Sequence, residues 1–301
     1  MRVGAYILLG DPRWLRQSVS SYYDRVERII ALGDEHHRAW DGTPLPVRAC
    51  IEELKRLDHA SKVTLCLEDL VDPQLHRMQQ DTHARRMALQ RLADVDWVLQ
   101  LDADEVMVAP ERFFEMLRLA DSRGVDAMDY PSRWMLGRTS VGGRNDLFLE
   151  ASDALLRVAS HYPGPLAVRP NVHLNYSRRA ICEYFRVDLR RRNTYHEYTW
   201  SHPVHAVVQP AEAILHLSWV DREDVSPKTT RQHGHAGDHA MEELAALRDR
   251  RLRHPLVTVA TTPFRAGHGH PHRLRLTRLR LTEEVAAFDR LLEWPWWRRD
   301  A

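Results

Sequence analysis

The first 135 residues alternate between short apolar runs and longer segments with helical spacing. Apolar runs that are each long enough for one strand lie at 3–9, 26–32, 63–67 and 97–101. The spacing predicts helices at 14–23, 44–57, 75–92 and 110–124, and a further strand at 125–136. Strands that alternate with helices indicate a parallel sheet with helices on its faces. We therefore predict an α/β fold with a mostly parallel, Rossmann-like sheet.

The fourth apolar run leads directly into three acidic residues, in the sequence DWVLQLDADEVM (96–107). The carboxylates of Asp102, Asp104 and Glu105 repel one another, and desolvation at a strand end increases that cost. Ligands of parallel sheets bind beyond the carboxyl ends of the strands. Mg²⁺ and Mn²⁺ prefer carboxylate oxygens and share their coordination with phosphates. We therefore predict a site for a divalent cation and a diphosphate here, and a solvated acidic turn is the alternative.

This stretch and its flanks resemble the family-two-like glycosyltransferases with the GT-A (nucleotide-diphospho-sugar transferase) fold. The resemblance is carried by DWVLQLDADEVM, by ILLGDPRWLRQSV and VERIIALGDE near the start, by THARRMALQRLADVDWV, and by ILHLSWVDREDVSPKTTRQHGHA. It spans nearly the whole chain. It implies an inverting, metal-dependent transfer of a sugar from a UDP- or GDP-type donor to the hydroxyl of a small-molecule, glycan or lipid-linked acceptor.

The resemblance also implies the metal ligands. Asp102 matches the first acid of the DxD motif, which lies near the ribose or the metal. Asp104 matches the second acid, which coordinates Mg²⁺ or Mn²⁺. His216, in ILHLSW, matches a later histidine that supplies a further ligand, and an imidazole ligand favours Mn²⁺.

For the base and the ribose, the resemblance points to the ends of the first two strands, at Leu9, Gly10, Asp11 and Asp34. Asp34 matches an acid that accepts a hydrogen bond from a uracil- or guanine-type base, although the sequence reads GDEH where DDGS is common. Arg86, in HARRMAL, matches an arginine that contacts the nucleotide. Lys228 and Arg231 are candidates to reach the diphosphate. A solvated side chain is an equally good interpretation of each of these three basic residues.

A carboxylate base is expected to take the proton of the attacking acceptor hydroxyl. The candidates between the acidic turn and His216 are Asp146, Glu150, Asp153, Glu183 and Asp188. Asp188, in FRVDLRRR, is favoured because the arginines that follow it keep a carboxylate ionised. Glu183 is the second choice. An acid that only pairs with those arginines is the alternative.

Two histidine-rich segments allow other interpretations. QHGHAGDHA approximates the metal cluster of metallo-β-lactamase-like hydrolases through His233, His235, Asp238 and His239, although its spacing is one residue too long and no apolar strand precedes it. GHGHPH offers a loop for adventitious metal binding through His268, His270 and His272. A non-catalytic nucleotide- or sugar-binding module would need the first two strand ends but not the DxD.

We divide the chain into a nucleotide-sugar-binding half (1–135), a loop-rich α+β acceptor-binding half of the same domain (136–237) and a C-terminal extension (238–301). The extension opens with an amphipathic helix at 238–253. It ends in RLRLTRLRL and LLEWPWWRRD, whose arginines and tryptophans suit either an anionic membrane surface or packing on the domain or on a second subunit.

Composition narrows the partners and the compartment. The formal net charge is only +1, so nucleic acid is not an expected partner. The three cysteines include no CxxC pair, which favours reduced thiols. The apolar run near the start is followed by GDP and Arg13, which favours a first strand over a signal peptide. We expect a cytoplasmic protein, free or held peripherally at the inner face of the membrane, and leave open whether it is a homo-oligomer.

Overall fold

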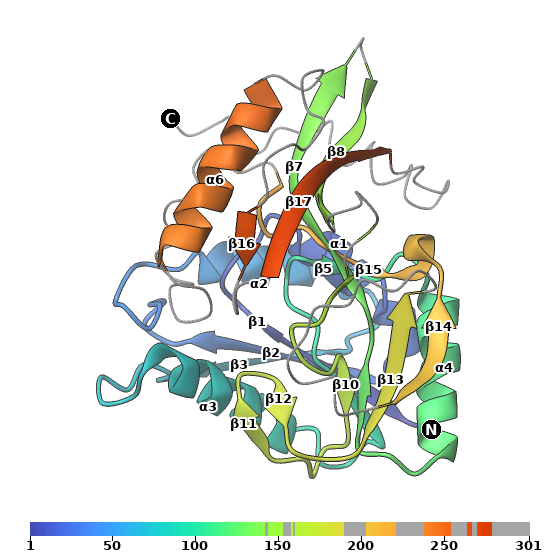
Figure 1. The fold of residues 1–301 in the computed structure, drawn as a ribbon. Helices are drawn as coiled ribbons and strands as arrows, with labels where there is room; N and C mark the ends of the chain where they lie inside the picture. Colours follow the sequence, from blue (N-terminus) through green and yellow to red (C-terminus); the bar gives the residue numbers. More distant parts are fainter. Residues whose placement is uncertain are drawn as a thin grey trace.

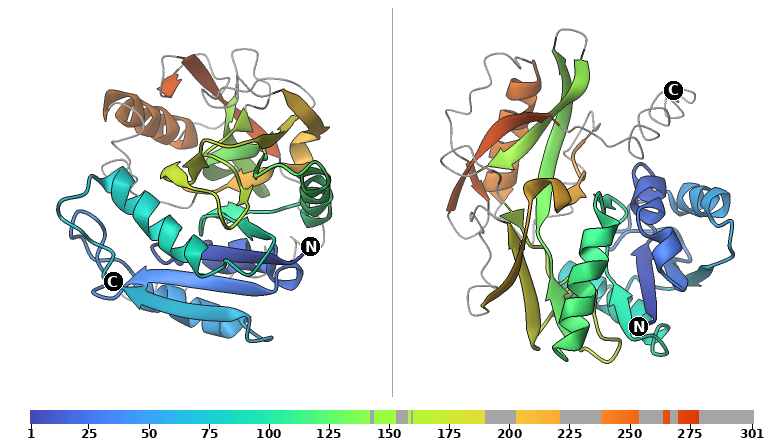
Figure 2. Two further views of the ribbon diagram at one scale, coloured as in Figure 1. Left: turned by 90° about the horizontal axis from the view of Figure 1, so that it is seen from below. Right: turned by 90° about the vertical axis from the view of Figure 1, so that its right-hand side faces the viewer.

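The computed structural model describes residues 1–141, 144–152, 158, 160–189, 203–220, 238–253, 264–266 and 270–278. These residues form two sheets, a short hairpin and the helices that pack on them (Figure 1). Figure 2 gives two further views of the same arrangement.

The larger sheet has eight strands in the order β14-β13-β6-β10-β4-β1-β2-β3. In chain order they are β1 (Val3–Leu8), β2 (Arg28–Asp34), β3 (Val63–Glu68), β4 (Trp97–Leu99), β6 (Ala127–Asp129), β10 (Ala167–Val168), β13 (Tyr184–Leu189) and β14 (Val204–Val208). Every neighbouring pair is parallel except the two that β10 makes with β4 and β6. The predicted α/β fold with a mostly parallel sheet is confirmed.

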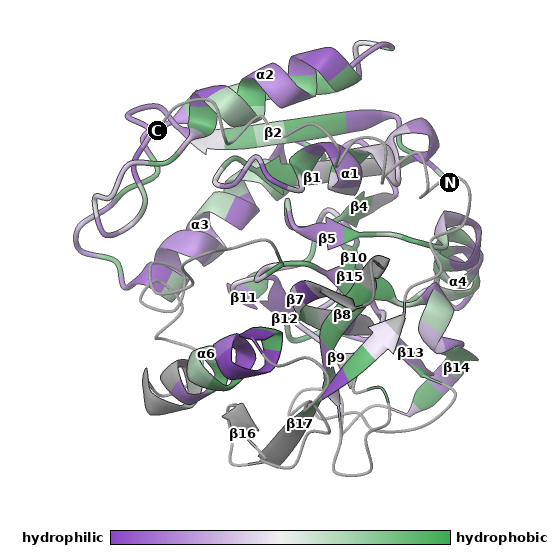
Figure 3. Cartoon of the chain, turned by 90° about the horizontal axis from the view of Figure 1, so that it is seen from above, coloured by the Kyte–Doolittle hydropathy of each residue, from purple (hydrophilic) through white to green (hydrophobic). Residues whose placement is uncertain are grey.

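Helices cover both faces of this sheet because its central strands are apolar on both sides. Ile7 belongs to the core that contains residues of α1 (Leu15–Ser20), α2 (Val47–Leu57) and α4 (Pro110–Ser122). Tyr6, which points to the other face, packs with residues of α3 (Arg77–Gln90). In Figure 3 the strand β2 is hydrophobic along most of its length, whereas α2 carries hydrophilic and hydrophobic stripes. Such continuous apolar runs are typical of strands in covered parallel sheets.

Two predicted elements differ more from the observed ones than the others, whose ends shift by three residues or fewer. The helix predicted at 14–23 ends at Ser20 and is followed by a short 3₁₀ helix, η1 (Tyr23–Arg25). The strand predicted at 125–136 is two strands, because the chain leaves the larger sheet after Asp129 and enters the smaller one at Ser132. Pro131 stands between them and has no N–H to donate to a ladder.

The smaller sheet has the path β16-β17-β8-β7-β15-β5, with β9 paired to β7. Its strands are β5 (Glu105–Val106), β7 (Ser132–Val141), β8 (Arg144–Ser152), β9 (Ser160–His161), β15 (Ile214–His216), β16 (Phe264–Ala266) and β17 (His270–Arg278). Helix α6 (Asp238–Arg253) lies beside this sheet, and its Leu244 and Leu247 pack with Leu136 and Trp219. The helix predicted at 238–253 is confirmed.

Strands of the smaller sheet come from all three predicted segments of the chain, and the division into those segments stays a prediction. The first part of RLRLTRLRL lies in β17 and pairs with β8, so this part packs on the protein itself. None of the described helices combines the length and the apolar content needed to cross a bilayer. The three cysteines are free thiols, as expected.

The core position of β4 can be tested at Leu99, which is fully buried. We expect Leu99→Ala to lower the free energy of unfolding by about 2–5 kcal/mol, because the substitution leaves a cavity that the sheet and helices cannot fill. Urea denaturation measures this loss. Leu119→Ala, at a position 43% exposed on α4, is the matched control and should change the free energy much less. Equal losses would contradict the core position of β4.

Candidate functional site

The candidate site lies at one edge of the larger sheet. The strands β1, β2, β4, β6 and β13 run in one direction, either as parallel neighbours or across the antiparallel strand β10. Their carboxyl ends therefore meet at one edge, where ligands of such sheets bind. Acidic residues stand at or just beyond these ends at Asp11, Asp34, Asp102, Asp129 and Asp188.

The acidic residues after β4 form a tight turn into β5. The backbone N–H of Glu105 donates to the Asp102 carbonyl at 3.0 Å, and the N–H of Asp102 donates to the Glu105 carboxylate at 2.9 Å. Ser18 of α1 donates its hydroxyl to the same Asp102 carbonyl at 3.0 Å. The turn thus has its own hydrogen bonds and is tied to α1.

Two arginines neutralise two of the three acids. Arg178 donates to the carboxylates of Asp102 (2.8 Å) and of Glu105 (2.8 and 2.9 Å), and to the Gln100 carbonyl (2.6 Å). Arg85 of α3 donates to the other Asp102 oxygen at 2.8 Å. Burial opposes ionisation of Asp102, but Arg178 and Arg85 outweigh it and lower the pKa of that carboxyl. The protein therefore supplies much of the positive charge that these acids require.

Arg178 is placed by a hairpin that is anchored on α3. The hairpin consists of β11 (Leu174–Tyr176) and β12 (Arg179–Ala180), and Ser177 at its turn has a left-handed φ of 54°. The Ser177 N–H donates to the Thr82 hydroxyl at 2.7 Å, and the Ser177 hydroxyl donates to Asp81. A Cβ at Gly164 would lie 2.8 Å from Cγ of Arg178, so this glycine leaves the room that the arginine occupies.

Asp104 faces β15 instead of the arginines. Its carbonyl accepts the Leu217 N–H at 2.7 Å, and its carboxylate accepts the Ser218 hydroxyl at 2.8 Å. His216 Nε2 lies 3.6 Å from the Asp104 carboxylate and 2.5 Å from the Ser218 hydroxyl oxygen. The antiparallel pairing of β15 with β5 sets His216 opposite Glu105 and brings these distant segments together.

The pair of Asp104 and His216 suits a shared divalent cation. Two ligands of one ion lie roughly 3 Å apart when each bond is about 2.0–2.2 Å, so the observed 3.6 Å needs only a small shift. Their side chains are 11% and 13% exposed, which leaves part of each accessible. Asp102 lies outside this pair, since its two oxygens face Arg85 and Arg178. Its predicted contacts with the metal and the nucleotide stay predictions.

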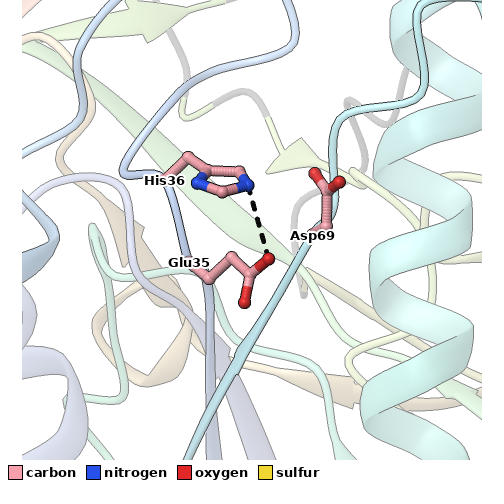
Figure 4. A group of neighbouring side chains, drawn as sticks. All are labelled: Glu35, His36 and Asp69. Carbon is pink, nitrogen blue, oxygen red and sulfur yellow. Dashed lines mark ion pairs between the residues drawn. The ribbon is translucent and has the colours of Figure 1, made fainter.

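A second cluster of ligand-type side chains lies on the loops after β2 and β3. Within the described ranges, Glu35, His36 and Asp69 form the one group of three whose ligand atoms lie within 4.8 Å of one another (Figure 4). All three are exposed, His36 approaches Glu35 at 3.3 Å, and Asp69 pairs with Arg38 at 3.2 Å. A substitution in this cluster is therefore a matched control for metal binding at Asp104 and His216.

The predicted nucleotide residues after β1 lie at the expected edge. Leu9 is buried, and its N–H continues the β1–β2 ladder by donating to Leu32. Gly10 has open space where a Cβ would stand. The Asp11 carboxylate accepts from Arg13 Nε at 2.9 Å. Contacts of these residues with a nucleotide stay a prediction.

Asp34, at the end of β2, organises two loops. Its buried carboxylate accepts the backbone N–H groups of His36 (2.9 Å) and Arg38 (3.0 Å), and that of Leu70 at 3.3 Å. Asp34 therefore fixes the loops that follow β2 and β3. A direct hydrogen bond to a base stays a prediction.

Arg86 contacts the hairpin of β11 and β12, whereas the neighbouring Arg85 contacts Asp102. Arg86 Nε donates to the Leu174 carbonyl at 2.7 Å, and its Nη2 lies 2.7 Å from His173 Nε2. A nucleotide contact for Arg86 stays a prediction. Arg85 was not predicted, although the sequence contains a pattern that indicates it. It lies four residues after its partner Asp81 and on the buried stripe of α3. No sequence pattern indicates Arg178 as a partner of the acids, because its position depends on the fold of the hairpin.

Of the predicted bases, Asp188 shares the edge with the acidic turn. Its buried carboxylate accepts the Tyr162 hydroxyl at 3.0 Å and Arg186 Nη2 at 3.3 Å. The arginine that contacts Asp188 is therefore Arg186, which precedes it in β13, and not one of the arginines that follow it in the sequence. Glu183 is exposed and precedes β13, at the opposite edge of the sheet. Glu150 lies in the smaller sheet, fully buried and bonded twice by Arg133.

Asp129 is a buried carboxyl that the sequence analysis did not single out. It ends β6 and stands opposite Arg186 in the ladder with β13. Within the described part of the chain its carboxyl makes no hydrogen bond or ion pair. Burial raises its pKa from 3.8 to about 7, although Arg186 and Arg179 act in the other direction. A carboxyl that titrates near neutral pH therefore lies at this edge.

Several predicted residues lie outside the described residues or side chains. They are Lys228, Arg231, Asp146, Asp153, the cluster His233, His235, Asp238 and His239, and the loop histidines His268, His270 and His272. The Trp-rich end of the chain lies outside as well. The hydrolase and membrane-contact interpretations rest on these segments and stay predictions.

No family model matches this chain, and no curated protein matches it in sequence. The solved structures that it resembles include a 4-diphosphocytidyl-2C-methyl-D-erythritol synthase from Anaerococcus prevotii (11% identity, TM-score 0.33, 56% of this chain and 71% of that one). A mannosyltransferase from Pyrobaculum calidifontis, in complex with GDP-Man and Mn²⁺, aligns at 14% identity and a TM-score of 0.33, over 43% of this chain and 35% of that one. A mannose-6-phosphate isomerase from Helicobacter pylori aligns at 13% identity and a TM-score of 0.28, over 51% and 56%. The matched part is thus about a third of the mannosyltransferase and about half of the isomerase, and TM-scores this low carry no functional inference.

Removal of Arg178 should destabilise the protein strongly. We expect Arg178→Met to lower the free energy of unfolding by about 3–5 kcal/mol, because it leaves the fully buried Glu105 carboxylate without its partner. Urea denaturation measures the loss, and Arg48→Met on the exposed side of α2 is the control. If Arg178→Met unfolds at the same urea concentration as the control, the arginine does not hold the turn.

Asp129 predicts a specific pH dependence of stability. Because its pKa is raised on folding, the unfolded chain loses this proton first, and the wild type loses stability as pH rises from about 4 to about 7. Asp129→Asn removes this loss, so its stability relative to wild type should increase by roughly 2–3 kcal/mol between pH 5 and pH 8. Chemical denaturation at both pH values measures the difference. Asp24→Asn, at an exposed position, is the control for the removed charge, and parallel curves for Asp129→Asn and wild type would contradict the raised pKa.

Proposed function

We propose that this protein is a metal-dependent glycosyltransferase of the GT-A type, which moves a sugar from a nucleotide-diphosphate donor to an acceptor hydroxyl. The observation that carries the proposal is the contact between Asp104, just after β4, and His216, at the end of β15. The resemblance pairs these two residues as metal ligands, and their 3.6 Å separation at the ligand edge of the sheet supports that pairing.

Asp104 and His216 are the residues that would hold the cation. Their mixture of carboxylate and imidazole suits Mn²⁺ better than Mg²⁺. When bound, the ion supplies positive charge that stabilises the departing diphosphate. Ser218, which donates to Asp104 and lies next to His216, orients both side chains.

Asp102 has a different part in the proposed site. Arg85 and Arg178 hold its carboxylate, and its backbone carbonyl is fixed by Ser18 and Glu105. It therefore keeps the turn in shape, so that Asp104 points toward His216. The open space at Gly10 and the loops ordered by Asp34 lie along the same edge, which supports a donor base and ribose beyond β1 and β2.

Asp188 is the proposed base for the acceptor hydroxyl. It lies at the same edge as the acidic turn, and Tyr162 and Arg186 fix its carboxylate. As a base it takes the hydroxyl proton while the oxygen attacks the sugar carbon. In an inverting reaction the base works on the face opposite the departing diphosphate. The acceptor stays open among a small molecule, a glycan and a lipid-linked sugar.

Thermal melting with nucleotides and metals tests the donor and the metal together. We expect one of UDP, GDP and dTDP to raise the melting temperature with Mn²⁺ or Mg²⁺ but not with EDTA, because the diphosphate is bound through the ion. A ligand at 100 times its dissociation constant adds about 2.7 kcal/mol to the stability of the folded state, which a melting curve resolves. Asp104→Asn should lose this stabilisation.

Glu35→Gln is the matched control, because it removes one carboxylate from the other cluster at the same edge. It should keep the metal-dependent stabilisation of the wild type. The proposal is wrong if no nucleotide stabilises the wild type, or if Asp104→Asn responds to metal and nucleotide as the wild type does. A loss in Glu35→Gln alone would move the metal to the loops after β2 and β3.

A further inference from the structure

The strand β3 is the outermost strand of the larger sheet, beyond β2 (Figure 2). Two of its apolar side chains are unusually accessible, since Leu65 is 44% and Leu67 is 38% exposed. Thr64, which points to the other face, is exposed as well. The helices α2 and α3 therefore cover this edge only in part, at Val63 and Cys66.

Within the described part of the chain, the backbone groups on the outer side of β3 have no hydrogen-bond partner, except the Val63 N–H, which donates to the Asp58 carboxylate at 3.2 Å. The carbonyls of Lys62 and Glu68 accept from Ile29 and Glu35, which fixes the side of the strand that faces β2. Because backbone groups alternate along a strand, the N–H and C=O groups of Val63, Leu65 and Leu67 point away from β2. Natural edge strands are protected by proline, by bulges or by central charged residues. The sequence VTLCLE has no proline and no central charge, and its register with β2 has no bulge.

We propose that β3 pairs antiparallel with β3 of a second copy of this chain, about a two-fold axis at Leu65. In this register Leu65 stands opposite the partner's Leu65, and Val63 stands opposite the partner's Leu67. Leu65 then exchanges both backbone hydrogen bonds with the partner's Leu65, and the Leu67 N–H donates to the carbonyl of the partner's Val63. The Val63 N–H keeps its hydrogen bond to Asp58.

The side chains are self-complementary in the same register. One face of the joined strands carries only Val63, Leu65 and Leu67 from each copy, which buries apolar surface that is now exposed. On the other face Thr64 stands opposite the partner's Cys66. Lys62 stands opposite the partner's Glu68, and each of the two also has a contact in its own copy, Lys62 with the Tyr23 carbonyl at 3.0 Å and Glu68 with Arg91. Opposite charges at facing positions favour a pairing, and like charges disfavour it.

The pairing joins the two larger sheets into one continuous sheet. Since β1, β2, β3 and β4 are parallel, an antiparallel contact makes the carboxyl edges of the two copies point in opposite directions. Each candidate site then opens on its own side of the dimer. The inference does not depend on the reaction that the site catalyses.

Charge substitutions at the two-fold axis test the pairing, with sedimentation equilibrium as the measurement. The wild type should be a dimer. Leu65→Glu and Leu65→Lys should each be monomeric, because each places two like charges opposite one another. An equal mixture of the two variants should form a heterodimer, since Glu then faces Lys.

Thermal melting of both variants controls for folding, and the exposed position of Leu65 makes an intact fold the expected result. A wild type that stays monomeric at the highest concentration that remains in solution overturns the proposal. So does a dimer that persists unchanged in Leu65→Glu and Leu65→Lys.

A disulfide tests the register itself. Thr64 and the partner's Cys66 form a non-hydrogen-bonded pair, whose Cα atoms lie about 4.5 Å apart, within the range that a disulfide spans. Thr64→Cys, in a Cys182→Ser background, should therefore form a covalent dimer under mild oxidation. Ala60→Cys in the same background lies outside the pairing and should not cross-link faster than the background protein. Failure of Thr64→Cys to cross-link, or equal rates for both variants, overturns this register.

Discussion

The ion pairs of Arg178 with Asp102 and Glu105 hold the point at which the larger sheet passes into the smaller one. Arg178 is nearly inaccessible and Glu105 is completely so, so each charge depends on the other for its place in the interior. Glu105 is also the first residue of β5, which pairs with β15. The position of His216 in β15 therefore depends on Arg178, which lies in the hairpin of β11 and β12.

The three acids after β4 divide into two kinds. Asp102 and Glu105 face arginines of the protein, and Asp104 faces Ser218 and His216. A cation is one way to relieve the repulsion among three carboxylates, and the fold uses its own arginines for two of them. Among these three acids, Asp104 is the one for which we propose a cation as the partner. This division explains how a strand that is buried on both faces can end in three acids.

Much of the architecture could be predicted from the sequence, because strands covered on both faces must be apolar at every position. The runs that became β1, β2 and β4 are such segments, and α6 follows from its periodicity and its charges. The run that became β3 is apolar although this strand is exposed at the edge of the sheet. The prediction failed where one apolar run serves two sheets, on either side of Pro131. At the site, Asp104 and His216 were paired by resemblance, whereas Arg85, which pairs with Asp102, was not singled out. The nucleotide contact of Arg86 stays a prediction. Side chains of neighbouring residues on a helix point about 100° apart. Arg85 therefore reaches Asp102, whereas Arg86 points to the hairpin.

The sequence by itself determined the elements, their order, and the edge of the sheet at which the acids stand, because these depend on local periodicity and on the direction of parallel strands. Only the tertiary structure decided which charges meet. Arg178 lies more than 70 residues after the acids that it neutralises, and His216 lies more than 110 residues after Asp104. No local pattern fixes such partners, since the contact depends on the path of the whole chain between them. The burial that makes each pairing necessary arises only when the sheets have packed.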